Sequence, residues 1–280
     1  MIWGYAGVWL GQYLKLNGRP YQSLMPRLEF LAEWGLKCTD WSARDLAGMA
    51  APDREAALAY IAGHDLSLSL WAGGGYFGEA AEARRIADES LAAVRRYKEA
   101  VRAPIAVTGA GDIHRFVKKP PLDEQLGILA ARLAPVAAGC REMGLELGIE
   151  NHGDYYVSDM VELCRRVPNL RLRLDTGNCY LIGEKTLPAI REGAPFSIGT
   201  HFKDHVVRPR PDARPLHFEV GGSVLGEGDV GLREAYDILL QHAPDPKSLV
   251  MAIELVPPDG MDPVEALRRS LAFVRSLPEP

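Results

Sequence analysis

The chain has 280 residues, of which 47% are hydrophobic and 25% charged, as is ordinary for a soluble globular protein. A formal net charge of −5 provides no basic footprint, so no nucleic-acid partner is expected. Four scattered cysteines, no basic leader and no run near the ~20 apolar residues of a membrane span favour a cytoplasmic protein without a membrane partner.

Eight short runs of β-forming residues succeed one another along the chain. They occupy residues 2–9, 36–41, 66–73, 104–109, 145–152, 170–178, 197–204 and 248–256. A segment of helical period follows each run, at 21–34, 52–62, 79–101, 122–143, 158–167, 186–192, 231–243 and 262–277. The stretch from 205 to about 230 is expected to be a long loop.

Strict alternation of strands and helices predicts an α/β fold with a parallel sheet and right-handed crossovers. Eight repeats favour closure into one (β/α)8 TIM barrel that takes up residues 1–280 as a single domain. An open, doubly wound sheet is the alternative.

Two GxGxxG patterns, at 73–78 and 226–231, suggest a dinucleotide site that their surroundings do not support. The strand after the first pattern ends in Gly and Ala instead of the acidic residue that would hold a ribose. The second pattern follows a loop. We therefore expect no nucleotide cofactor.

Several polar residues lie at the carboxyl end of the fifth strand, in the stretch "LELGIENHG". Side chains alternate along a barrel strand, so Leu147 and Ile149 should face the helices. Glu150 and His152 should then face inward at the end where barrel enzymes build their sites. Asn151 should point away and secure the strand end.

The same alternation applied to the later strands puts one charged or imidazole group at the same end of each. The resulting set is Glu150, Asp175, His201 and Glu254. Three converging carboxylates repel one another unless a cation lies between them. Three oxygen donors and one imidazole suit a divalent metal, with Mn²⁺ as the first expectation and Mg²⁺, Co²⁺ or Zn²⁺ as alternatives.

Three further charged residues, Glu146, Arg171 and Arg173, point inward lower in the barrel. Isolated buried charges are costly, so a buried ion pair that fills the interior is expected. Arg173 could instead reach up to Glu150 or Asp175.

Five motifs in the second half of the chain carry a resemblance to a known family. They are "IENHG" at 149–153, "LDTGN" at 174–178, "HFKD" at 201–204, "LGEGDV" at 225–230 and "IELV" at 253–256. With these motifs the chain resembles the xylose-isomerase-like TIM barrels, the sugar phosphate isomerase and epimerase family. That family includes ketose 3-epimerases, inosose isomerases and dehydratases, and one branch of 3-dehydroshikimate dehydratases. The first half matches only in its strand–helix rhythm.

The resemblance implies that the four residues above are the metal ligands and that Glu150 and Glu254 also act as catalytic acid and base. His152 and Lys203 match positions that contact substrate in dehydratase-like members. Asn178 stands where ketose epimerases usually carry histidine, which argues against a simple free-ketose epimerase. The "ENH" version resembles members that act on cyclic polyols or keto-sugars.

These observations predict a metal-dependent isomerase or epimerase of a carbohydrate or polyol, working through a metal-stabilised enediolate. The alternative is a carbon–oxygen lyase that uses His152 as its base, since a free imidazole is well suited to proton abstraction at neutral pH. A homo-oligomer is compatible with either activity. A related apurinic endonuclease would need more strand-end histidines, and a non-catalytic barrel would not need the full ligand set.

Two more residues are candidates for substrate binding. Trp71, at the end of the third strand, could stack on a sugar ring or simply cap the barrel. His114, after the fourth strand, could contact substrate or lie in a solvated loop. Lys203 could stabilise an oxyanion or form a salt bridge to Asp204 or to a ligand carboxylate.

Overall fold

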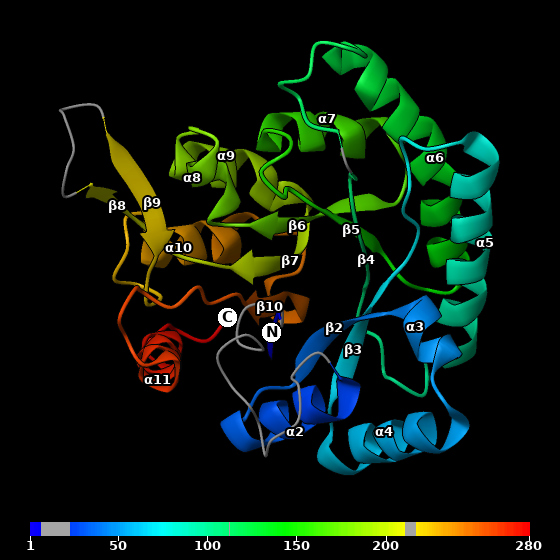
Figure 1. Ribbon diagram of the computed structural model, residues 1–280, viewed down its shortest axis with the longest axis horizontal. Helices are drawn as coiled ribbons and strands as arrows, with labels where there is room; N and C mark the ends of the chain where they lie inside the picture. Colours follow the sequence, from blue (N-terminus) through cyan, green and yellow to red (C-terminus); the bar gives the residue numbers. More distant parts are fainter. Residues whose placement is uncertain (7–22, 112, 211–216) are drawn as a thin grey trace.

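A computed structural model describes residues 1–6, 23–111, 113–210 and 217–280 (Figure 1). Eight parallel strands close into a barrel: β1 (Ile2–Tyr5), β2 (Cys38–Ser42), β3 (Ser67–Trp71), β4 (Ala106–Gly109), β5 (Leu147–Glu150), β6 (Leu170–Asp175), β7 (Ser197–Phe202) and β10 (Val250–Ile253). The last of these pairs with the first, Ile2 opposite Val250. The predicted (β/α)8 barrel is confirmed. The predicted strand end at 7–9 and helix start at 21–22 lie outside the described residues.

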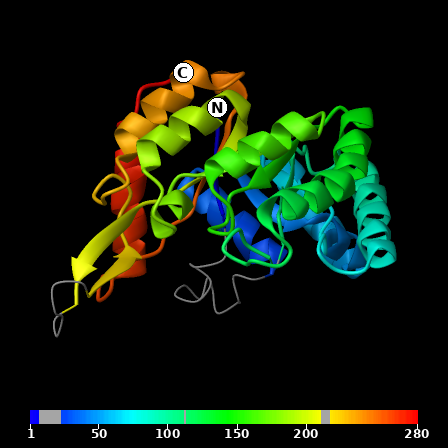
Figure 2. The same cartoon turned by 90° about the horizontal axis from the view of Figure 1, so that it is seen from above.

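A helix follows each barrel strand and packs on its outer face (Figures 1 and 2). The predicted helices are present as α2 (Leu24–Trp34), α4 (Ala51–His64), α5 (Ala80–Tyr97), α6 (Leu122–Glu142), α7 (Val157–Arg166), α9 (Thr186–Gly193), α10 (Leu232–His242) and α11 (Pro263–Arg275). Short elements that the periodicity did not predict are α3 (Ala43–Gly48), α8 (Asn178–Leu181), η1 (Ala194–Phe196) and η2 (Pro246–Ser248).

Local sequence sets where these helices begin and end. The Asp262 carboxylate accepts a hydrogen bond of 3.2 Å from the Val264 amide, and Pro263 opens α11. At the other end of the chain, α2 stops at Gly35, whose φ of 72° is a left-handed conformation that glycine adopts without steric cost.

The main core lies between the strands and the helices. Leu147, Ile149, Leu172 and Leu174 all face outward from β5 and β6 and are fully buried. Burying such a side chain stabilises the fold by about 1.5–3 kcal/mol. Because these alternate residues serve the outer layer, their neighbours are left to face the barrel axis.

The lower inward charges differ from expectation. Arg171 and Glu146 do pair, at 2.8 Å, but their side chains are 38% and 44% exposed. The prediction that they form a buried ion pair was therefore wrong, because the pair lies at the open amino-terminal mouth of the barrel, where water still reaches it. Arg173 is fully buried and pairs with Asp40 from the opposite wall.

The segment expected to be a loop contains a hairpin of β8 (His205–Pro209) and β9 (Phe218–Gly222), with Val207 opposite Val220. Figures 1 and 2 show it projecting from the barrel. The two chain termini lie side by side, and the Tyr236 hydroxyl donates a 2.7 Å hydrogen bond to the Pro278 carbonyl. Among the described helices, none is both long and apolar enough to cross a bilayer.

Candidate active site

The four predicted ligand side chains converge at the carboxyl end of the barrel. Asp175 of β6 lies opposite His201 of β7, which in turn lies opposite Ala252 of β10, two residues before Glu254. Glu150 ends β5, beside β6. One ligand atom from each of the four lies within 4.8 Å of the others, and all four residues are buried.

Positive groups lie between these carboxylates. His201 Nδ1 is 2.9 Å from Glu150 Oε1 and 3.2 Å from Glu254 Oε2. Lys203 Nζ lies 2.9 Å from Glu254 Oε2 and 3.1 Å from Asp175 Oδ2. Lys203 therefore pairs with two of the predicted ligand carboxylates, which was one of the predicted alternatives, and not with Asp204.

The pKa values of the carboxyls reflect this crowding. Burial raises the pKa of Asp175 to about 6, although the Lys203 charge opposes it. Burial acts in the same direction on Glu254, but hydrogen bonding and charge from His201 and Lys203 outweigh it and lower its pKa. Burial lowers the pKa of His201, yet the carboxylates of Glu150 and Asp40 raise it well above its ordinary value. The cluster thus attracts positive charge.

The fixed charges at the site do not balance. Four carboxylates face two permanent cations: Asp40, Glu150, Asp175 and Glu254 against Arg173 and Lys203. With a neutral imidazole, these buried carboxylates outnumber the buried cations by two, and such an excess is costly unless a further cation offsets it. A divalent cation would neutralise this excess, and the oxygen and nitrogen donors suit such an ion. The residues present therefore fit a divalent metal.

Asn151 secures the rim between β5 and β6. Its side-chain carbonyl accepts from the Asp175 amide at 2.8 Å, and its side-chain amide donates to the Asp175 carbonyl at 3.0 Å. The Asp175 carboxylate accepts 2.8 Å hydrogen bonds from the backbone amides of Gly177 and Asn178. These contacts fix the direction in which the Asp175 carboxylate points.

The second glycine-rich pattern has a structural role. Asp204, just after β7, accepts hydrogen bonds from the amides of Gly226, Gly228 and Val230 at 2.9, 3.1 and 3.3 Å. A side chain at Gly228 would meet the Asp204 carboxylate at 2.3 Å, so only glycine fits there. The motifs "HFKD" and "LGEGDV" therefore bind each other and hold the end of β7 in place.

A cavity of about 520 Å³ opens above the cluster and is a candidate substrate pocket. Glu150, His201 and Glu254 line its floor side, and Trp71 and His152 line its walls. Trp71 is half-buried and His152 is exposed. The cavity is large enough for a sugar or a cyclic polyol.

The other predicted substrate contacts lie in different surroundings. Asn178 is 3% exposed, donates from its amide to the Asn151 carbonyl at 3.0 Å, and accepts from Lys203 at 3.1 Å. Its side chain is thus used within the protein. His114 is exposed in the loop after β4, near Phe116, and does not line the cavity.

Asp40, from β2, is a site residue that the sequence-based prediction missed. Its Oδ2 atom lies 3.2 Å from His201 Nε2 and 2.7 Å from Arg173 Nη2. It was detectable, because alternation along Cys38–Ser42 puts Asp40 on the inward face together with Cys38.

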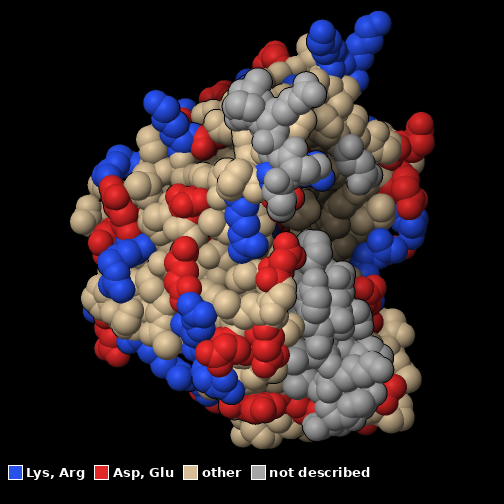
Figure 3. Space-filling view, turned by 60° about the vertical axis from the view of Figure 1, so that its left-hand side comes forward, with Lys and Arg blue, Asp and Glu red and all other residues tan. Residues whose placement is uncertain are grey.

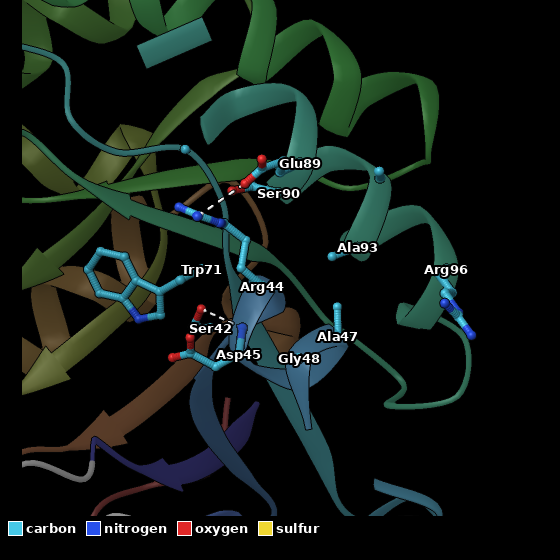
Figure 4. Close-up of a pocket in the computed structure, with 12 residues that line it drawn as sticks. Ser42, Arg44, Asp45, Ala47, Gly48, Trp71, Glu89, Ser90, Ala93 and Arg96 are labelled. Carbon is cyan, nitrogen blue, oxygen red and sulfur yellow. Dashed lines mark hydrogen bonds and ion pairs between the residues drawn. The ribbon is translucent and has the colours of Figure 1, made fainter. Parts of the chain in front are cut away.

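A second cavity, of about 780 Å³, lies between α3 and α5 (Figure 4). It shares Ser42, Asp45 and Trp71 with the first. Across it Arg44 of α3 reaches Glu89 of α5, at 3.1 Å, with both side chains more than 40% exposed. Figure 3 shows acidic and basic side chains interspersed over the described part of the face that it presents.

Comparison with known proteins gives a family and a set of similar folds. The sequence model of the xylose isomerase-like TIM barrel family matches residues 28–277. A search of curated proteins found no match. Among solved structures, a 3-keto-D-glucoside 4-epimerase from E. coli has a TM-score of 0.71 at 14% identity, covering 99% of both chains.

Two other structures extend the comparison. A xylose isomerase-like TIM barrel protein from Mycobacterium smegmatis in complex with magnesium has a TM-score of 0.66 and 17% identity over 92% of this chain and 90% of the other. A protein from Bacillus anthracis, described as the probable 3-DHS dehydratase of petrobactin synthesis, has a TM-score of 0.67 and 13% identity over 98% of both chains. At these identities the likeness concerns the fold.

Proposed function

The chain belongs to the family of xylose isomerase-like TIM barrels, and from this premise we propose a divalent-metal-dependent isomerase or epimerase of a sugar, keto-sugar or cyclic polyol. The observation that carries the proposal is the buried quartet of three carboxylates and one imidazole, whose ligand atoms lie within 4.8 Å of one another. A divalent ion held by Glu150, Asp175, His201 and Glu254 would polarise a substrate carbonyl and acidify the neighbouring C–H.

Glu150 and Glu254 are the proposed proton-transfer groups. Glu150 ends β5 and Glu254 directly follows β10, three strands away around the barrel mouth, so they would approach a bound substrate from different sides. For both carboxyls, burial raises the pKa but the neighbouring positive groups outweigh it and lower the pKa. Both are therefore ionised near neutral pH, as a proton acceptor must be.

Other groups would bind and orient the substrate. The Lys203 ammonium, 2.9 Å from Glu254, would stabilise negative charge that develops on a substrate oxygen. Trp71 offers a half-buried aromatic face in the cavity wall for a sugar ring. Asn178 would act through Lys203, because the side-chain carbonyl of Asn178 accepts a hydrogen bond from the Lys203 ammonium.

A metal-dependent dehydratase is the second candidate, and the position of His152 favours it. The His152 side chain lines the cavity beside Glu150 but lies outside the ligand quartet. An imidazole that does not bind the metal can act as a base near neutral pH. The similarity in fold to the B. anthracis protein supports this candidate.

One experiment separates the candidates. A panel of keto-sugars, inososes and 3-dehydroshikimate is incubated with Mn²⁺-loaded protein in deuterated water and followed by NMR. We expect a stereoisomer or positional isomer with solvent deuterium on the carbon next to the carbonyl, and no turnover after metal removal by a chelator. A product with a new double bond would assign the dehydratase. Full turnover by metal-free protein would contradict both candidates.

A further inference from the structure

Three side chains meet inside the barrel: Asp40 contacts both His201 and Arg173, which come from the neighbouring strands β7 and β6. His201 Nδ1 faces the ligand carboxylates, 2.9 Å from Glu150, whereas Nε2 faces away from them, 3.2 Å from Asp40 Oδ2. Arg173 Nη2 lies 2.7 Å from the same Asp40 oxygen. Asp40 comes from β2, which is four strands from the β6 of Arg173 in either direction around the barrel.

We infer that Asp40 is a positioning residue for the metal, because it holds the His201 ring in the tautomer that can bind a cation through Nδ1. An imidazole nitrogen binds a metal only when it carries no proton, so a neutral His201 ligand must keep its proton on Nε2. An ionised carboxylate only accepts hydrogen bonds, so Asp40 at Nε2 selects that tautomer. This inference rests on the proposed metal site.

Arg173 keeps the Asp40 carboxylate in place. Its side chain is fully buried, and Asp40 is the carboxylate with which it forms an ion pair in the described structure. Gly148, on the neighbouring strand, lies beside Arg173, and a Cβ there would be 3.4 Å from the Arg173 Cβ. A carboxylate held on one side by a permanent cation is free to accept the imidazole proton on the other.

The competing explanation is that Asp40 only neutralises Arg173 and that its contact with His201 has no consequence for the metal. The two explanations differ in metal affinity. If Asp40 positions the His201 ring, removing Asp40 weakens Mn²⁺ binding by more than the loss of one of several negative charges near the cation would. Asp45, an exposed carboxylate that lines the same cavity, controls for the loss of one negative charge from the cavity wall, and the state of the His201 ring is read separately below.

The test measures Mn²⁺ affinity by isothermal titration calorimetry for the wild type, Asp40→Ala, Asp40→Asn and Asp45→Asn, each checked for folding by circular dichroism. We expect both Asp40 variants to bind Mn²⁺ about 10–100-fold more weakly, the usual effect of removing the partner of a ligating histidine. Asp45→Asn should stay within about twofold of the wild type. If Asp40→Ala does not fold, Asp40→Asn, which keeps the shape of the side chain, decides.

A second readout reports the ring directly. In Zn²⁺-loaded, ¹⁵N-histidine-labelled protein, two-bond ¹H–¹⁵N spectra should show His201 bound through Nδ1 with its proton on Nε2, the resonance being assigned by its loss in His201→Asn. Coordination through Nε2, or Asp40 variants with wild-type Mn²⁺ affinity, would overturn the inference alone. A wild-type protein with no affinity for Mn²⁺ would overturn the proposed function as well.

Discussion

The cavity at the barrel mouth and the cavity between α3 and α5 meet at Trp71, yet their charges are arranged in opposite ways. In the first, carboxylates are buried and outnumber the permanent cations. In the second, which is larger, Arg44 and Glu89 are exposed and neutralise each other. Excess buried charge, and not volume, is therefore the property that separates the proposed site from the other cavity.

The sharpest way to break this comparison is to remove one charge from each cavity. We expect Glu254→Gln to lower turnover by about 10³-fold, because the change removes both a ligand and a proton-transfer group. Mn²⁺ affinity should fall as well. The same substitution in the other cavity, Glu89→Gln, should leave both quantities unchanged. Turnover is followed by the NMR assay and affinity by calorimetry, and activity retained in Glu254→Gln without metal would refute the site.

His152 sharpens the comparison within the first cavity, since it lines the wall without belonging to the charge cluster. If it is the base, His152→Ala should reduce kcat by about 10²-fold while Mn²⁺ affinity stays at the wild-type value. Steady-state kinetics and calorimetry on the same sample check this. An unchanged kcat would return the role of base to Glu150 and Glu254.

Glu184 tests whether a half-buried carboxylate outside both cavities affects only stability. Both its oxygens accept from the Val157 amide at 3.1 Å, and burial raises its pKa to about 7. The folded state thus holds a proton that the unfolded state has released, so stability falls as pH rises from about 4.5 to about 7.

Glu184→Gln removes this pH-dependent cost. Allowing for its partial exposure, we expect the variant to be about 1 kcal/mol more stable than the wild type at pH 8. At pH 4, where both side chains are neutral, the two proteins should be equal. Urea unfolding at the two pH values measures the difference, and an equal gain at both would show that the carboxyl is not the cause.

The smallest effect is expected from Arg44→Ala in the second cavity. Exposed ion pairs contribute little, so the free energy of unfolding should change by no more than about 0.5 kcal/mol. Metal affinity and turnover should stay at wild-type values. A tenfold change in either would show that the second cavity takes part in function, and the contrast between the cavities would fail.

The barrel and its ligand quartet could be predicted because both depend on alternation along short strands. Leu147 and Ile149 mark the outer face of β5, and that fixes Glu150 on the inner face. The positions of the four residues follow from such local patterns on separate strands. Their metal binding is still a prediction.

Side-chain pairings between elements far apart in the sequence were harder to predict. The partner of Arg173 is Asp40, which lies on the opposite wall, and sequence spacing does not say how far a long side chain reaches across a barrel. Arg171 of β6 pairs with Glu146, the residue just before the adjacent β5, but the exposure of the pair depends on where the barrel ends. The hairpin of β8 and β9 was missed because its two short strands are largely exposed and carry no core pattern.

The amide of Asn151 has a consequence for engineering. It donates to and accepts from the backbone of Asp175, as a peptide group of a strand would. It therefore extends the hydrogen bonding between β5 and β6 by one residue beyond the end of β5. The chain is then free to turn outward at His152. A library meant to change the specificity of this rim should therefore treat Asn151 as scaffold, and begin its variation at His152.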